Sequence, residues 1–200
     1  MSDRFYLACF RDNVGSSVGW HCIDGRGYST NIDKAHVYTL EEAQEELNQA
    51  REIDLPISAD HVDALAVWKV DHQYIPNESQ VIDGISQYVA FERGGREGRY
   101  DGNDVYWLNT ESCSTSTDFD KASVMGASRA KGLDPCYIVV PFETANKFKR
   151  RTFDKNLFNP LVMIQGAGLT IPKHLKKLRL SVKKLHIELE NSAGPVGALL

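Results

Sequence analysis

Short apolar runs separated by turn residues dominate the first 145 positions of the chain. Phe5–Phe10 is apolar at every position, which predicts a strand covered on both faces, and Tyr88–Phe91 has the same character. Shorter strands are predicted around Trp20–Ile23 and Val105–Leu108, each after a turn-rich loop. Two hairpins therefore open two separate stretches of the sequence.

Each hairpin is followed by a helix signal. In the first stretch Thr39 and Glu42 have the spacing of a capping box, and an apolar stripe follows at Leu40, Ala43, Leu47 and Ala50. In the second stretch the helix is predicted only over 126–131, because Gly132 ends it. Each stretch then closes on an apolar run, Ala64–Trp68 and Cys136–Val140, which predicts a central strand.

The last fifty residues differ in pattern. Residues 166–172 contain two glycines and a proline and predict a loop, followed by a short helix over 173–178. Apolar residues then alternate with polar ones at 178–182 and again at 185–189. This alternation predicts one strand with a bulge or two strands joined by a turn.

A repeated motif relates the two stretches. Trp20 and the segment 29–37 (STNIDKAHV) recur 87 positions later as Trp107 and the segment 116–124 (STDFDKASV). The spacing of Thr30 to Asp33, and of Thr117 to Asp120, predicts two capped helical turns rather than catalytic groups.

We therefore expect an α+β fold of two tandem β-β-(turn)-β-α-β repeats in antiparallel or mixed sheets. The expected repeats span residues 1–76 and 85–146, followed by a basic C-terminal extension over 147–190 and a flexible tail over 191–200.

Charge is distributed unevenly along the 200 residues, whose net charge is −4. Residues 1–146 contain 24 acidic and 12 basic side chains, whereas residues 147–184 contain 11 basic side chains and the single Asp154. This asymmetry indicates either a surface for an anionic partner or a basic segment folded against its own acidic body.

Cysteines and histidines give no metal-binding spacing. The four cysteines form no C-x-x-C pair, so we expect free thiols. His21, Cys22 and His36 lie close together in the first repeat, but the second repeat has Leu108, Asn109 and Ser123 at the equivalent places. We accordingly expect no metal and no cofactor, and with no apolar run of transmembrane length or secretory signal we expect a cytoplasmic protein.

An enzymatic interpretation comes from Ser114-Thr115-Ser116-Thr117 and Glu188-Leu189-Glu190, which resemble the Ser-Thr-Ser strand and Glu-x-Glu turn of arginine-directed ADP-ribosyltransferases. The resemblance implies that Ser116 positions the nicotinamide ribose, that Glu188 or Glu190 supports transfer, and that Arg93, Arg96 or Arg99 holds the NAD phosphates. The recurrence of the Ser-Thr pair at Ser29-Thr30 favours a structural role instead.

Two exposed segments are the predicted partner-binding sites. The glycine-rich loop over 94–102 presents Arg96, Arg99 and Tyr100, which favours a mobile loop that contacts a partner. The basic segment interleaves cations with aromatic residues, as nucleic-acid binding requires. Its candidate contact residues are Lys147, Lys149, Arg150, Arg151, Lys176 and Lys177.

The first repeat also resembles a module of small bacteriophage and prophage accessory proteins. The residues that carry the likeness are Trp20, Gly27-Tyr28-Ser29-Thr30, Asp33-Lys34-Ala35 and Tyr38-Thr39-x-Glu41-Glu42-Ala43. The resemblance implies a non-enzymatic accessory protein that binds and inhibits or modulates a host or defence protein in a bacterial cell. A nucleic-acid-binding protein using 147–184 is the alternative, ADP-ribosyl transfer is a more distant one, and homo-oligomer formation stays open.

Overall fold

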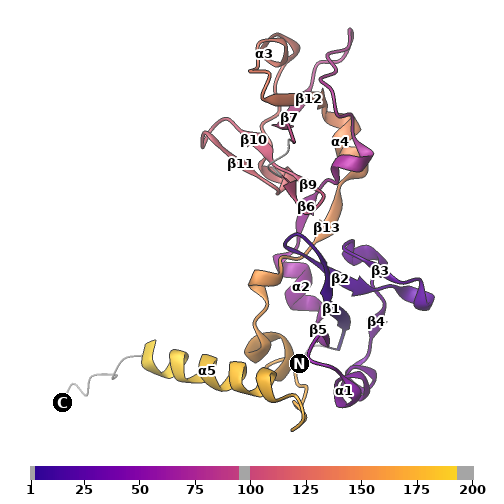
Figure 1. The fold of residues 1–200 in the computed structure, drawn as a ribbon, viewed down its shortest axis with the longest axis vertical. Coiled ribbons are helices and arrows are strands. Elements are labelled where there is room, and N and C mark those ends of the chain that lie inside the picture. The colour runs from indigo at the N-terminus through magenta and orange to yellow at the C-terminus, as the bar shows by residue number, and fades with distance from the viewer. Residues whose placement is uncertain (1–2, 95–99, 193–200) are drawn as a thin grey trace, which may run out of the picture.

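The computed structural model describes residues 3–94 and 100–192. Figure 1 shows two lobes joined at a narrow waist, with the N-terminal lobe at the bottom and the second lobe at the top. Strands β6 (Val67–Lys69) and β13 (Arg150–Thr152) lie side by side at the waist and pair antiparallel.

The N-terminal lobe is built around one long strand. Strand β1 (Phe5–Val14) pairs antiparallel with β2 (Ser17–His21) and β4 (Val37–Tyr38) and also with β5 (Asp54–Ser58), while β3 (Tyr28–Ser29) extends the sheet beyond β2. Helices α1 (Leu40–Gln49) and α2 (Ala59–Leu65) flank this sheet. The predicted capping box of Thr39 and Glu42 is confirmed at the start of α1.

The second lobe contains a four-stranded antiparallel sheet in the order β11-β10-β7-β12. Its strands are β7 (Tyr88–Glu92), β10 (Trp107–Asn109), β11 (Ser114–Ser116) and β12 (Tyr137–Pro141). Helices α3 (Ala127–Lys131) and α4 (Phe142–Phe148) complete the lobe, and β8 (Tyr100–Asp101) forms a small ladder with β9 (Asp104–Val105). The mixture of helices and antiparallel sheets confirms the predicted α+β class.

The two motif tryptophans occupy corresponding places in their sheets. Trp20 is paired with Ser29, Trp107 is paired with Ser116, and both indoles are fully buried. A buried tryptophan anchors each core, because so large an apolar side chain dominates the surface removed from water. Descent of the two lobes from a duplicated segment stays a prediction.

The capped turns lie where the motif places them, but the predicted capping residues are wrong. Asn31 Oδ1 accepts the amide of Asp33, and Asp118 Oδ1 accepts the amide of Asp120. They cap the turns η2 (Ile32–Lys34) and η4 (Phe119–Lys121). Thr30 and Thr117 were expected to do this, but the turns begin later and are too short for a capping box.

The predicted closing strand over 64–68 is also wrong for the first lobe. Residues 64 and 65 end helix α2, and the strand that pairs with β1 is the preceding segment β5. In the second lobe, β12 does pair with β7 as its run of apolar residues predicts. A strand over 54–58 was not expected because the segment contains a proline. The strand lies at the edge of the sheet, where proline is tolerated.

Just past the waist, the chain that leaves each lobe pairs with the hairpin of the other lobe. Val18 of the first hairpin donates its amide to the carbonyl of Phe153, 3.0 Å away, after β13 has left the second lobe. In the opposite direction Val105 donates to the carbonyl of Val70 at 3.1 Å, just after β6. The lobes are thus joined by backbone pairing in both directions rather than by a simple linker.

The C-terminal segment returns to the N-terminal lobe. The turn η6 (Leu161–Gln165) is π-helical, and its residues Met163 and Ile164 are buried in the core of the first lobe. The remaining short turns are η1 (Ile23–Gly25), η3 (His72–Tyr74) and η5 (Lys155–Leu157).

Helix α5 (Lys176–Ser192) replaces the strands predicted over 178–189, which is a correction. Apolar residues at 178, 182, 185 and 189 have helical as well as alternating spacing, and the lysines and leucines around them favour helix. Figure 1 shows α5 projecting sideways from the lower lobe. Among the described residues, none of the helices has the length and apolar character needed to cross a membrane.

Candidate binding surface on the C-terminal helix

The two arginines of the predicted basic surface are used inside the molecule. Arg150 donates to Asp104 Oδ1 at 2.7 Å and to the Thr30 hydroxyl at 3.1 Å. Arg151 bridges two carboxylates, Asp33 at 3.0 Å and Asp63 at 2.7 Å. The charge asymmetry was compatible with a surface for an anionic partner or with a basic segment folded against its own acidic body. For Arg150 and Arg151 the second alternative holds.

Lys147 and Lys149 lie at the same waist. The Lys149 ammonium lies over the ring of Trp68, 4.8 Å from its centroid, and the Lys147 ammonium lies 5.4 Å from the centroid of Phe148. Such cation–π contacts partly satisfy the charges and hold the aromatic rings. The aromatic residues of this segment therefore pack locally instead of standing free to stack on bases.

A buried lysine is paired with two carboxylates at the waist. Lys69, whose side chain is 2% exposed, donates to Asp101 Oδ2 and to the Ser16 hydroxyl, both at 2.8 Å. Burial alone would raise the pKa of Asp101, but hydrogen bonds from Lys69 and Ser16 outweigh it and hold that pKa below its usual value. Asp104, fully buried, lies 3.8 Å from Lys69 as well as beside Arg150.

The structure describes only part of the predicted partner-binding loop over 94–102. Arg96 and Arg99 lie outside the described residues. Tyr100 stacks on His72, with ring centroids 4.4 Å apart and planes at 13°. The Tyr100 ring is therefore held against the segment that follows β6 and packs on the core of the upper lobe.

Lys176 and Lys177, by contrast, open helix α5 on the surface of the lower lobe. The Lys177 amide donates to Glu52 Oε1 at 2.7 Å, which fixes the first turn of the helix to the end of α1. Leu175 and Leu178 pack into the lobe's core, and Val182, one turn further along α5, is also buried. The first half of α5 is thus firmly anchored by its apolar stripe.

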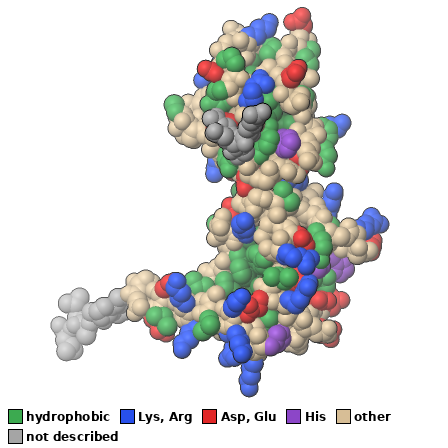
Figure 2. All heavy atoms as spheres, in the orientation of Figure 1, with side chains coloured by type: hydrophobic (Ala, Val, Ile, Leu, Met, Phe, Trp, Pro, Cys, Tyr) green, Lys and Arg blue, Asp and Glu red, His purple; other side chains and the backbone are tan. Residues whose placement is uncertain are grey.

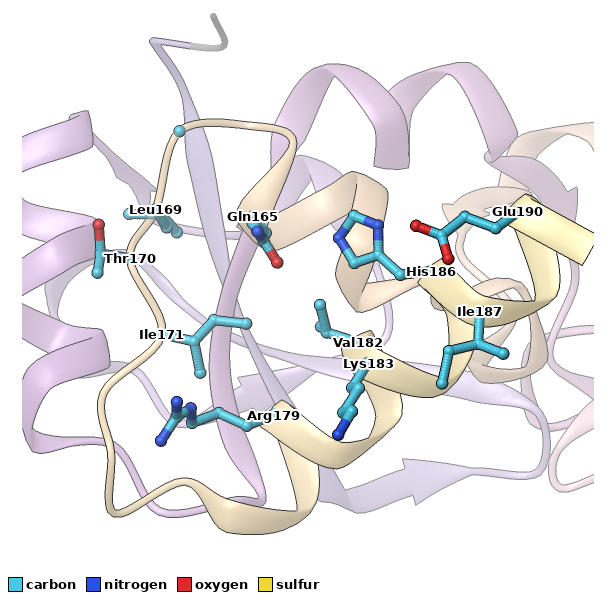
Figure 3. A pocket seen from close by; sticks show the side chains of 11 residues that line it. Gln165, Leu169, Thr170, Ile171, Arg179, Val182, Lys183, His186, Ile187 and Glu190 are labelled. Atoms are coloured by element: carbon cyan, nitrogen blue, oxygen red, sulfur yellow. The ribbon is translucent and has the colours of Figure 1, made fainter.

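From Arg179 to Glu190, one face of α5 borders a groove of about 660 Å³. The segment 165–171 lines it on one side and α5 on the other. In Figure 3, Ile171, Val182 and Ile187 lie between these two walls. Arg179 and Lys183 lie along one edge, and Figure 3 shows the carboxylate of Glu190 turned toward His186 at the other.

Large apolar side chains on α5 are exposed both in this groove and outside it. Leu180 is 65% exposed, Ile187 47% and Leu189 58%. Figure 2 shows Lys and Arg side chains gathered on the same part of the molecule. Within the part of the chain that the structure describes, the side chains of Lys176, Arg179 and Lys183 make no ion pair.

This surface was not predicted, because the alternation of apolar and polar residues over 178–189 indicated a strand. A helical reading of the same residues would have put Leu180 and Ile187 seven positions apart on one face, among lysines. That spacing was the available signal.

The residues of the ADP-ribosyltransferase reading do not form one site. Ser116 ends strand β11 in the upper lobe, whereas Glu188 and Glu190 lie on α5, which extends from the lower lobe (Figure 1).

Potential metal ligands gather elsewhere in the lower lobe. Cys9, His21 and Asp54 each offer one ligand atom, and these atoms all lie within 4.8 Å of one another. Burial opposes ionisation of Asp54, but hydrogen bonds from Cys9, Arg51 and His21 outweigh it and lower its pKa. Cys9, His21 and Asp54 are far apart in the sequence, and only the pairing of three strands brings them together.

Comparison with known proteins adds no identification to this geometry. No family model, no curated protein and no solved structure matches the chain.

Proposed function

We propose that the protein is a non-enzymatic binding protein that uses α5 and its groove to hold an acidic, partly apolar surface of another protein. The observation that carries the proposal is the exposed pair Leu180 and Ile187 within a basic helix. Exposed aliphatic anchors framed by charge are typical of helices that dock on a partner, because the anchors supply affinity and the charges supply orientation.

The positive charge of α5 favours a partner with an acidic surface. The first nine residues of α5 contain Lys176, Lys177, Arg179, Lys183 and Lys184 and no acidic residue. Only Lys177 and Lys184 have an acidic partner among the described residues, at 3.7 Å in each case. An acidic partner surface would therefore find several cations available.

A protein is favoured over a nucleic acid as this partner. Arg150 and Arg151 are the main residues of the nucleic-acid-binding alternative. Both form ion pairs within the chain, Arg150 with Asp104, and Arg151 with Asp33 and Asp63. Nucleic-acid affinity depends on cations that are free to neutralise phosphates. Leucine and isoleucine side chains on α5 add nothing to phosphate binding but fit an apolar protein surface.

The resemblance of the first repeat to phage accessory proteins gives the proposal its biological setting. On that basis the partner is a host or defence protein met in the bacterial cytoplasm, and binding inhibits or modulates it. A second copy of the chain is the other protein partner that the test must separate.

The experiment compares two matched surface changes in the full chain. Leu180→Glu with Ile187→Glu places acid in the proposed contact, whereas Val124→Glu places acid at an equally exposed apolar residue of the upper lobe, 48% exposed. Proteins captured from a nuclease-treated bacterial lysate are identified, and the best candidate is purified for calorimetry. We expect the wild type and Val124→Glu to bind it alike and the double variant to bind at least about tenfold more weakly, about 1.4 kcal/mol.

Three outcomes would count against the proposal. Equal binding by all three proteins would place the contact elsewhere. Sedimentation of the wild type as a dimer that only the double variant abolishes would assign α5 to self-association. Salt-sensitive binding of a short DNA or RNA duplex, lost in Arg150→Ala with Arg151→Ala, would favour the nucleic-acid alternative.

A further inference from the structure

Three strands of the lower lobe bring a thiol, an imidazole and a carboxylate to one place. In the register of β1 with β5, Cys9 is directly opposite Asp54. In the register of β1 with β2, Cys9 is opposite Gly19, so His21, two residues further, lies on the same face. The convergence follows from strand pairing and is invisible in the linear spacing.

The separation of the ligand atoms fits a tetrahedral ion. His21 Nε2 lies 3.4 Å from Asp54 Oδ1. Metal–nitrogen and metal–oxygen bonds of about 2.0–2.1 Å at a tetrahedral angle place such atoms about 3.4 Å apart. The Cys9 sulfur lies within 4.8 Å of both, so a small movement of its side chain completes a three-ligand set.

The surroundings hold these ligands in position. Arg51 donates to the other oxygen of the Asp54 carboxylate, Oδ2, which leaves Oδ1 turned toward His21. Asp12 Oδ2 lies 3.3 Å from the Cys9 sulfur and accepts its thiol proton in the metal-free protein, a contact that ends when the thiol loses that proton, so Arg51 is the group that holds the ligand set. Hydrogen bonds that fix the ligands from behind are a usual part of metal sites.

We propose that Cys9, His21 and Asp54 form a zinc-binding site in the N-terminal lobe, with the fourth position open to water. One sulfur, one nitrogen and one oxygen ligand are the donor types that zinc takes. Binding requires loss of the Cys9 proton. The ion displaces this proton on binding, so affinity rises with pH.

Solvent reaches the site from the side of His21. The Cys9 side chain is fully buried, but the His21 side chain is 28% exposed and lines a pocket of about 430 Å³. Tyr28 packs its ring against His21, with centroids 4.7 Å apart. An ion can thus enter past His21 while the thiol stays shielded from oxidants.

The second lobe cannot repeat the site. In its sheet Glu92 is opposite Tyr137, as Cys9 is opposite Asp54 in the first sheet. Leu108 follows Trp107 as His21 follows Trp20. The proposed ion therefore belongs to the N-terminal lobe alone.

Cobalt titration of the full reduced chain tests the proposal. A thiolate ligand gives Co²⁺ a charge-transfer band in the near ultraviolet, and we expect that band at one equivalent of Co²⁺ and its loss when Zn²⁺ is added. Cys9→Ser should abolish the band and weaken binding more than tenfold, Arg51→Ala should weaken it roughly tenfold, and Cys22→Ser, which changes a neighbouring thiol, should leave it unchanged.

Circular dichroism shows whether each variant is folded. If Cys9→Ser does not fold, His21→Asn serves instead, because the imidazole is partly exposed and outside the apolar core, and it should also weaken binding more than tenfold. Absence of the band in the wild type at excess Co²⁺ would overturn the proposal. So would a band that survives both Cys9→Ser and His21→Asn or is lost in Cys22→Ser.

Discussion

Replacing Lys69 by methionine tests whether the buried charges at the waist hold the two lobes together. Methionine keeps most of the apolar volume of the lysine stem but removes the ammonium group. That ammonium donates to Asp101 and Ser16 at 2.8 Å and lies 3.8 Å from Asp104. The perturbation therefore removes the charge while leaving the packing nearly unchanged.

The expected cost follows from what each carboxylate retains. Breaking a buried ion pair by removing one partner costs about 3–5 kcal/mol. Asp101 is 17% exposed and keeps the Ser16 amide at 2.7 Å, and Asp104 keeps Arg150 at 2.7 Å. We therefore expect the lower end of that range, about 3 kcal/mol of lost unfolding free energy.

Urea unfolding followed by tryptophan fluorescence measures this loss. Trp20 and Trp107 are buried in different lobes, so single-tryptophan versions report on each lobe separately. Lys121→Met is the matched control, because its ion pair with Asp118 is 3.5 Å long and its side chain 62% exposed, and it should cost less than about 1 kcal/mol.

Lys69→Met combined with Asp101→Asn should be less destabilised than the sum of the single changes by more than about 1 kcal/mol. A loss for Lys69→Met no larger than that of Lys121→Met would refute the reasoning.

Two further predictions concern the same waist. Gly15→Ala should cost roughly 2–4 kcal/mol, because Gly15 has φ of 61° and an added Cβ would lie 2.3 Å from the backbone of Asp101. Gly27→Ala, with φ of 81° and open space around it, should cost only about 1 kcal/mol, and equal losses in urea unfolding would contradict this account. The pKa of Asp101 is lowered by folding, so its stabilisation is present above the unfolded value of about 3.9 and is lost as pH falls through the folded value. Asp101→Asn should therefore lose less stability than the wild type as pH falls below about 4, and parallel pH curves in that range would exclude this contribution.

The strongest local signals in the sequence led to correct elements. The apolar run at Phe5–Phe10 is a central strand, and the capping box at Thr39 begins α1. Apolar patterns that fit both the strand period and the helix period led to a wrong prediction. The segment 178–189 fits a strand and a helix equally in its apolar positions, and burial of Leu178 and Val182, four residues apart, selects the helix.

The sequence by itself determined the α+β class, the two anchoring tryptophans and the separation of acidic from basic residues. Those properties depend on residue type and on neighbours within a few positions. Tertiary structure alone decided how the charges are used, since it buries Arg150 against Asp104 and leaves the cations of α5 exposed. It also placed Cys9 opposite Asp54, because strand pairing brings together residues that no local pattern connects.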